Sequence, residues 1–152
     1  MASSIVTRVM SMIYINNFTS KGDKGKVVIT AGANEFHEIG AWMISDLLEM
    51  NGWDVYYLGS NTPESDLYQM LLAVQPHILV ISVTMFFNLS SAAFVIRAIK
   101  QNPDIQNIKI LLGGAAVKAD PDLTKKLGAD ATADHAVEAL KLVNDLAPQT
   151  GA

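Results

Sequence analysis

A histidine flanked by glutamates is the feature of the sequence best suited to metal chemistry. The stretch reads Glu35-Phe36-His37-Glu38-Ile39-Gly40. A neutral imidazole is the commonest protein ligand of transition metals, and a carboxylate often holds its second ring nitrogen. Glu35 is a candidate for that supporting role. Glu38 competes with it, although its place in the first turn of a predicted helix suits it equally to the helix dipole. A hydrogen-bonded structural histidine is the alternative interpretation.

His77 and His135 are weaker candidates for a metal ligand. His77 precedes a predicted strand, at the amino end of the sheet, and is predicted to lie on the surface. His135 follows a short predicted strand beside Asp134, where the start of a helix is the simpler account. A zinc site built by protein side chains needs three or four ligands, and we can gather only His37 with its glutamates. A metal bound through His37 would therefore take its remaining ligands from a macrocycle, either corrin or haem.

Strands and helices alternate along the predicted secondary structure. Short apolar runs predict strands at residues 26–31, 54–58, 78–83, 108–112 and 130–133. Amphipathic segments predict helices at residues 38–51, 63–74, 90–100, 120–127 and 134–146, with Thr62 as the N-cap of the second. This order predicts an α/β fold: a flavodoxin-like (Rossmann-like), doubly wound, five-stranded parallel sheet in a three-layer αβα arrangement. The very apolar strand 78–83 is expected at its centre.

Two further predicted strand ends carry residues suited to ligand binding. Ser82 and Thr84 place two hydroxyls on the same side of an extended chain, and Gly113-Gly114 let a bulky ligand approach the backbone. Taken singly, backbone capping explains the hydroxyls equally well, and a tight strand-to-helix turn explains the glycines. Ligands of open α/β sheets bind beyond the carboxyl ends of the strands, at the switch point. These residues and His37 all fall on that predicted edge.

Together the three stretches resemble the B12-binding domain family, whose pattern is Asp-x-His-x-x-Gly, then Ser-x-Leu, then Gly-Gly. The matches here, in order, are Glu35-Phe36-His37-Glu38-Ile39-Gly40, Ser82-Val83-Thr84 and Gly113-Gly114. The resemblance covers roughly residues 26–146 and includes the sequence LGAD at residues 127–130. It implies that cobalamin binds base-off with His37 as the lower cobalt ligand. Its nucleotide tail would lie between the serine and glycine motifs, with Ser82 hydrogen-bonded to it.

Departures from the family pattern bear on the expected function. Glu35 stands where Asp is usual and Thr84 where Leu is usual, and Ala41 follows Gly40 where corrinoid methyltransferase proteins and mutases often carry Lys. A Glu-x-His-x-x-Gly motif is more similar to the sensory and photoreceptor branch. The resemblance therefore favours a cobalamin-binding sensory or regulatory domain that is not itself an enzyme. Light sensing, signal transduction and transcription regulation are its expected context, with adenosyl-, methyl- or hydroxocobalamin as cofactor.

The same residues are also compatible with other functions. One alternative is a corrinoid carrier protein, or the B12 module of a mutase, serving methyl transfer or rearrangement. A second is a haem-binding sensor domain of the same fold, and a third is a flavodoxin-like domain that only mediates contacts. The sequence holds no Ser-His-Asp arrangement, no phosphate-binding loop of the G-x-x-x-x-G-K type and no crevice carboxylates beyond Glu35 and Glu38. Any chemistry would therefore belong to the cofactor.

The chain is expected to comprise three parts. Residues 1–25 form a predicted helix and a polar linker, residues 26–147 the cobalamin-binding domain, and residues 148–152 a C-terminal tail. The photoreceptor branch places a four-helix bundle before this domain, over the upper face of the corrin. The first part is therefore interpreted as a remnant of such a helical cap, unless a partner chain supplies the cap or effector domain. The apolar residues of that predicted helix favour a homo-oligomer.

Composition narrows the remaining classes of function. Of the 152 residues, 50% are hydrophobic and 17% are charged, which is enough to bury a core. The net charge is −4 and no lysine–arginine cluster occurs, which argues against direct nucleic-acid binding. The absence of cysteine excludes disulfides and thiolate metal sites. The longest apolar stretches are too short to cross a bilayer and no secretory signal is visible, so we predict a cytoplasmic location.

Overall fold

The computed structural model describes residues 24–31, 39–118, 120 and 122–147. Its centre is a five-stranded parallel sheet with the strand order β2-β1-β3-β4-β5. The strands are β1 (Lys26–Thr30), β2 (Asp54–Tyr57), β3 (Ile78–Ser82), β4 (Lys109–Gly113) and β5 (Ala131–Thr132). The order confirms the predicted flavodoxin-like fold and the central place of β3, and it puts the switch point between β1 and β3.

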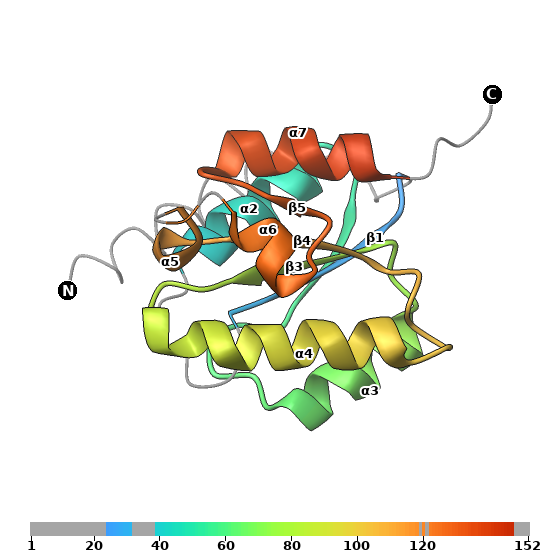
Figure 1. Cartoon of the computed structure of the whole chain (residues 1–152). Coiled ribbons are helices and arrows are strands. Elements are labelled where there is room, and N and C mark those ends of the chain that lie inside the picture. The colour runs from blue at the N-terminus through green and yellow to red at the C-terminus, as the bar shows by residue number, and fades with distance from the viewer. Residues whose placement is uncertain (1–23, 32–38, 119, 121, 148–152) are drawn as a thin grey trace.

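Helices cover both faces of the sheet, as the predicted three-layer arrangement requires (Figure 1). Helices α2 (Ile39–Met50) and α7 (Ala136–Leu146) lie on one face, and α3 (Glu64–Val74) and α4 (Leu89–Gln101) on the other. A 3-10 turn, η1 (Phe86–Asn88), leads from β3 into α4. The short helices α5 (Ala115–Lys118) and α6 (Leu123–Leu127) connect β4 to β5.

The central strands are apolar throughout because both of their faces are covered. Alternate residues of β3 enter different cores: Ile78 and Val80 pack on the side of α2 and α7, and Leu79 and Ile81 on the side of α3 and α4. All four side chains are at most 3% exposed. This two-sided burial is the physical reason for the unbroken apolar run that the sequence shows here.

The predicted single helix over residues 120–127 is wrong in its extent. Among its described residues only Leu123–Leu127 is helical, and the separate helix α5 precedes it. Ala116 and Val117 of α5 are buried in the core beside α4. Four residues make barely one helical turn, which is too short for an apolar periodicity to be detected.

The predicted cap of the second helix is wrong by one residue. Helix α3 begins at Glu64, with Pro63 in the N-cap position and no side-chain cap. The Thr62 hydroxyl instead donates to the carbonyls of Leu58 and Gly59, at 3.4 Å each. The threonine therefore stabilises the turn before the helix and leaves the helix end uncapped.

The terminal parts of the chain cannot be compared with their predictions. The predicted helix and most of the linker of residues 1–25, and the tail of residues 148–152, lie outside the described residues. The proposed division into three parts stays a prediction. Among the described helices, none is both long and apolar enough to cross a membrane.

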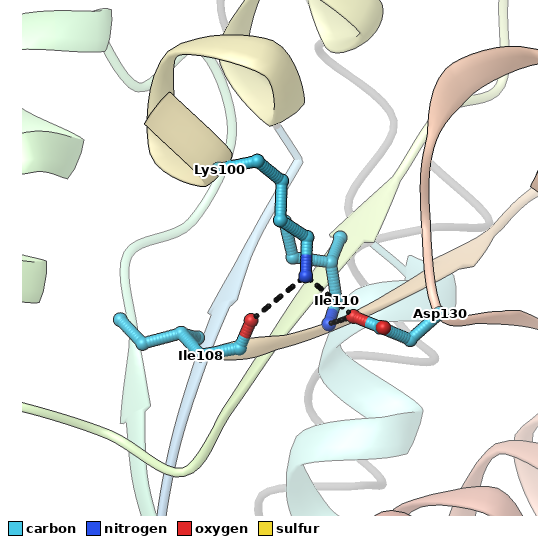
Figure 2. A network of polar contacts seen from close by, with 4 residues as sticks. All are labelled: Lys100, Ile108, Ile110 and Asp130. Carbon is cyan, nitrogen blue, oxygen red and sulfur yellow. Dashed lines mark hydrogen bonds and ion pairs between the residues drawn. The ribbon is translucent and has the colours of Figure 1, made fainter. Parts of the chain in front are cut away.

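An aspartate fastens the amino end of β4 to the start of β5 (Figure 2). Asp130 Oδ2 accepts a hydrogen bond from the Ile110 backbone N–H at 2.8 Å and lies 2.9 Å from Lys100 Nζ. Lys100 Nζ also donates to the Ile108 carbonyl at 3.4 Å. The acidic residue of the LGAD sequence is therefore a structural clamp, placed at the opposite end of β4 from the glycine pair.

This clamp predicts unequal effects of two substitutions on stability. Asp130→Ala leaves the Ile110 N–H without its partner, so we expect the free energy of unfolding to fall by about 1–3 kcal/mol. Lys100→Met keeps the aliphatic stem and removes a partly exposed ion pair together with the long hydrogen bond to the Ile108 carbonyl, so the loss should be about 0.2–1 kcal/mol. Urea denaturation followed by circular dichroism measures both. Equal losses in the two variants would show that the ion pair, and not the backbone hydrogen bond, is the main contribution.

Candidate functional site

A groove of about 390 Å³ opens at the carboxyl edge of the sheet. Helices α2 and α7 form its sides, and β3 and β4 its floor. Its lining residues are Gly40, Met43, Ile44, Val80, Ser82, Leu111, Leu112, Gly113, Gly114, Ala115, Lys118, Ala133, Asp134, His135, Ala136 and Ala139. A cavity of this volume falls in the range of small-molecule sites. It also lies at the edge where open α/β sheets bind ligands.

Small residues keep the groove open. On α7, Ala136 and Ala139 face it three residues apart, and Ala133 precedes them after β5. Val80, Leu111 and Ala139 are completely buried, so the deep part of the groove is apolar. Such a wall accommodates a flat apolar group and offers no hydrogen bond to a polar one.

Two of the glycines that line the groove have no steric reason to be glycine within the described structure. A Cβ at Gly40 would meet no atom within 4 Å, and a Cβ at Gly113 would meet only the Ala133 carbonyl oxygen, at 3.8 Å. Glycine weakens both helices and strands relative to alanine. Their absent side chains leave open space on the groove side of both residues. The predicted role of Gly113 in ligand binding stays a prediction.

Gly114 is glycine for a different reason. Its φ is +105°, and an added Cβ would lie 2.3 Å from the Val83 carbonyl oxygen. The two segments of the chain, after β3 and after β4, are held together here because the Val83 N–H donates to the Gly113 carbonyl at 2.8 Å. A tight strand-to-helix turn is therefore sufficient to explain the glycine at position 114, and no ligand is needed to explain it.

Ser82 is the most buried polar residue that faces the groove. Its exposed fraction is 5%, and its hydroxyl is not one of the fully buried polar atoms that lack a hydrogen-bond partner. Because Ser82 lines the groove, a ligand that fills the groove would be able to pair with this hydroxyl.

The other two residues of the serine motif lie elsewhere. Val83 is buried in the core on the α4 side of the sheet, because successive residues of an extended chain face opposite sides. Thr84 is half-buried beyond the end of β3 and does not line the groove. Of the predicted hydroxyl pair, only Ser82 reaches the groove.

His135 caps α7, as the helix-start interpretation predicted. Its Nδ1 accepts a hydrogen bond from the Glu138 backbone N–H at 3.1 Å, and the Glu138 carboxylate accepts one from the Asp134 N–H at 3.0 Å. This pairing resembles a capping box with histidine as the N-cap, except that the Glu138 carboxylate reaches back to the N–H of the residue before the cap. His77 is exposed at the amino end of the sheet, as predicted, where its Nδ1 accepts from the Lys26 N–H at 3.2 Å.

Most of the predicted histidine motif falls outside the described residues. Glu35, Phe36, His37 and Glu38 belong to residues 32–38, which connect β1 to α2, and Ile39 begins α2. Within the described part of the chain, no group of three or more His, Asp or Glu side chains could hold a metal ion. The structure thus defines the sides and floor of the groove and leaves the role of His37 a prediction.

The residues after Gly40 explain one departure from the family pattern. Ala41 is completely buried against the sheet, so the position that often carries Lys in corrinoid methyltransferase proteins is here part of the core. Trp42 contacts Tyr57 edge-on, with ring centroids 5.8 Å apart, and its indole N–H donates to Asp46 at 3.1 Å. Burial raises the pKa of the Asp46 carboxyl, and the indole hydrogen bond partly opposes this.

Comparison with known proteins identifies both sequence and structural relatives. A model of the B12 binding domain matches residues 25–141. Dimethylamine corrinoid protein 1 of Methanosarcina acetivorans is 28% identical over 123 residues, which cover 80% of this chain and 56% of that protein. The chain therefore spans little more than half the length of this curated relative.

Two solved structures share the fold. The monomethylamine corrinoid protein of Methanosarcina barkeri superposes with a TM-score of 0.80 at 22% identity, over 92% of this chain and 66% of that one. A chain of the methanol:cobalamin methyltransferase complex of the same organism gives a TM-score of 0.76 at 23% identity, over 87% of this chain and 50% of that one. At these identities the superpositions establish a common fold.

The glycines of the groove predict three different effects on the stability of the ligand-free protein. Gly40→Ala is expected to stabilise it by about 0.5–1 kcal/mol, because alanine favours the helix and meets no neighbour. Gly113→Ala should change the free energy of unfolding by less than about 0.5 kcal/mol. Gly114→Ala should destabilise by about 2–4 kcal/mol, from backbone strain and overlap with Val83. Urea titration of the three variants provides the measurement, and a tolerated alanine at position 114 would contradict it.

Proposed function

The chain belongs to the B12 binding domain family, and from this premise we propose that it is the corrinoid-carrying module of a methyl-transfer system. Its cofactor is cobalamin. The observation that carries the proposal is the groove between α2 and α7, whose shape and lining suit the nucleotide tail of a base-off corrinoid. When bound, cobalamin supplies a cobalt centre that can accept a methyl group from one partner and give it to another.

In this proposal the apolar depth of the groove receives the base of the nucleotide tail. Val80, Leu111 and Ala139 form a dry wall against the flat base, and the missing side chains at Gly40 and Gly113 provide the room. Ser82, which lines the groove at 5% exposure, donates a hydrogen bond to the base. In this proposal the Ser82 hydroxyl and the open space beside Gly40 and Gly113 have one common explanation.

His37 is the proposed lower ligand of cobalt, with Glu35 holding its second ring nitrogen. Residues 32–38 connect β1 to α2, so the segment that carries both residues joins the edge where the groove opens. The family pattern also assigns Phe36, Glu38, Ile39, Val83, Thr84 and Gly114 to the binding site. Those assignments, like that of His37, stay predictions.

The relatives favour a carrier over a sensor. The sensory interpretation depends chiefly on Glu35 standing where Asp is usual. By contrast, the relatives named above are corrinoid proteins and a methyltransferase complex. We therefore propose a methyltransferase as the partner, in place of a light-responsive effector. The match to a B12 binding domain gives no support to the haem alternative.

Cofactor retention tests the binding site. The purified chain is mixed with hydroxocobalamin, desalted and examined by absorption spectroscopy. We expect the wild type to retain the corrinoid, and His37→Ala to retain less of it with an altered cobalt spectrum. His77→Ala is the matched control, since His77 lies at the other end of the sheet, and it should behave like the wild type. Indistinguishable spectra for the wild type and His37→Ala would remove His37 as the ligand.

A second variant tests the groove itself. Gly113→Val places three carbon atoms where the tail base should lie, so the affinity for hydroxocobalamin should fall by at least about tenfold, roughly the cost of overpacking. Thermal unfolding of the ligand-free variant serves as the check on its fold. If a well-folded Gly113→Val protein binds hydroxocobalamin as tightly as the wild type, the tail lies elsewhere.

Light distinguishes the carrier from the sensor. The chain is loaded with adenosylcobalamin in the dark and its oligomeric state is measured by size-exclusion chromatography before and after green light. A carrier has no element coupled to the upper ligand, so the absorption spectrum should change on illumination while the elution volume stays constant. A light-dependent change of oligomeric state would favour the sensory interpretation.

A further inference from the structure

Three phenylalanines on η1 and α4 are exposed to solvent. Phe86 and Phe87 of η1 are 64% and 67% exposed, and Phe94 of α4 is 57% exposed. Since a phenylalanine buries about 150–250 Å², these three side chains together leave roughly 300–450 Å² of mostly apolar surface in contact with solvent. Apolar patches of this size on a monomer often mark an interaction site. None of the three lines the groove between α2 and α7.

We propose that this patch is the centre of a homodimer interface, in which the α4 helices of two copies of the chain pack antiparallel about a two-fold axis. A stable interface takes about 800 Å² from each partner, with an apolar centre and a polar rim. The phenylalanines supply close to half of that area, and polar residues around them supply the rim. Helix α4 lies on the face of the sheet away from α2 and α7 (Figure 1). The proposal does not depend on the proposed function.

The length and the exposed face of α4 suit such a pairing. Its exposed residues are spaced by four, three and four positions, so they lie along one face of the helix: Ser90, Phe94, Arg97 and Gln101. At a rise of 1.5 Å per residue, the 13 residues of α4 span about 20 Å. Phe94 lies near the middle of this length. An antiparallel pair centred on Phe94 therefore overlaps along nearly the whole helix and brings the two Phe94 rings together at the axis.

The charges around the patch favour a second copy as its occupant. Residues 83–101 contain no Asp or Glu, and the charged residue on the exposed face of α4 is Arg97. In an antiparallel pair centred on Phe94, Arg97 of one copy lies opposite Ser91 of the other, because both are three residues from the centre. Ser91 lines the same cavity as Glu64, which begins α3. The two-fold axis thus brings each guanidinium toward the acidic first turn of α3 in the other copy, and symmetry repeats the pairing.

Analytical ultracentrifugation of the full chain tests this interface. Sedimentation velocity from low to high micromolar concentration should show the wild type passing from monomer to dimer. Phe94→Glu places two carboxylates at the axis, so the dissociation constant of the dimer should rise by at least about thirtyfold, as for a hot-spot residue. Val137→Glu is the matched control, since Val137 is 67% exposed on α7, and it should dimerise like the wild type. Thermal unfolding checks that both variants keep their fold.

Exchanging two charges tests the antiparallel arrangement. Arg97→Glu brings a carboxylate toward Glu64 of the other copy, so the dissociation constant should rise about three- to tenfold. Adding Glu64→Arg to the same chain reverses both charges and should return the dissociation constant toward the wild-type value.

Three results would overturn the proposal. A wild type that stays monomeric at every concentration would leave the patch to a different partner. A dimer that Phe94→Glu does not weaken would place the interface elsewhere on the molecule. A dimer that Arg97→Glu weakens and Glu64→Arg does not rescue would contradict the antiparallel pairing of the two α4 helices.

Discussion

No side chain fits at position 114, because the chain leaving β4 passes directly against the backbone of Val83. The contact is fixed from both sides: the Val83 N–H donates to the Gly113 carbonyl at 2.8 Å, and the Ala116 N–H donates to the Val83 carbonyl at 3.2 Å. This close approach, with the positive φ of Gly114, turns the chain into α5 at once. It brings Gly113 and Lys118 to the lining of the groove. Part of that lining therefore depends on one glycine whose role is steric.

The two glycines of that pair look equivalent in the sequence and differ physically. The protein's own backbone forbids a side chain at Gly114, whereas Gly113 has ordinary space above it. Nothing among the described residues requires a glycine at position 113, so this glycine is compatible with the proposed ligand. Gly40 on α2 likewise has open space where a side chain would be, and Gly40 and Gly113 both line the groove. A motif thus combines residues that build the site with residues that make room in it.

The sequence was sufficient to predict the sheet, its helical layers and the edge at which the groove opens. The alternation of strands and helices predicts a parallel sheet, and an unbroken apolar run such as β3 indicates burial on both faces. It was insufficient where a residue's role depends on distant neighbours. Ala136 and Ala139 resemble ordinary core residues of an amphipathic helix, and only the fold shows that they face a groove. Val83 was grouped with Ser82 by its motif, although alternation along the strand sends it to the opposite core. Helix α5 is too short for its periodicity to register.

The groove includes a residue that weakens the ligand-free protein. Gly40 costs helix α2 up to about 0.5–1 kcal/mol relative to alanine. Gly40 lines the groove, and a ligand that fills the groove would offset this cost. Binding is therefore linked to the stability of this edge: at a hundredfold excess over its Kd, a ligand adds about 2.7 kcal/mol to the free energy of unfolding. At the opposite edge, Asp130 pairs with the Ile110 N–H and with Lys100 and so fastens β4 to β5 without any ligand. The two ends of the sheet therefore differ: contacts within the protein hold the amino end together, whereas the carboxyl end leaves a groove for the proposed cofactor.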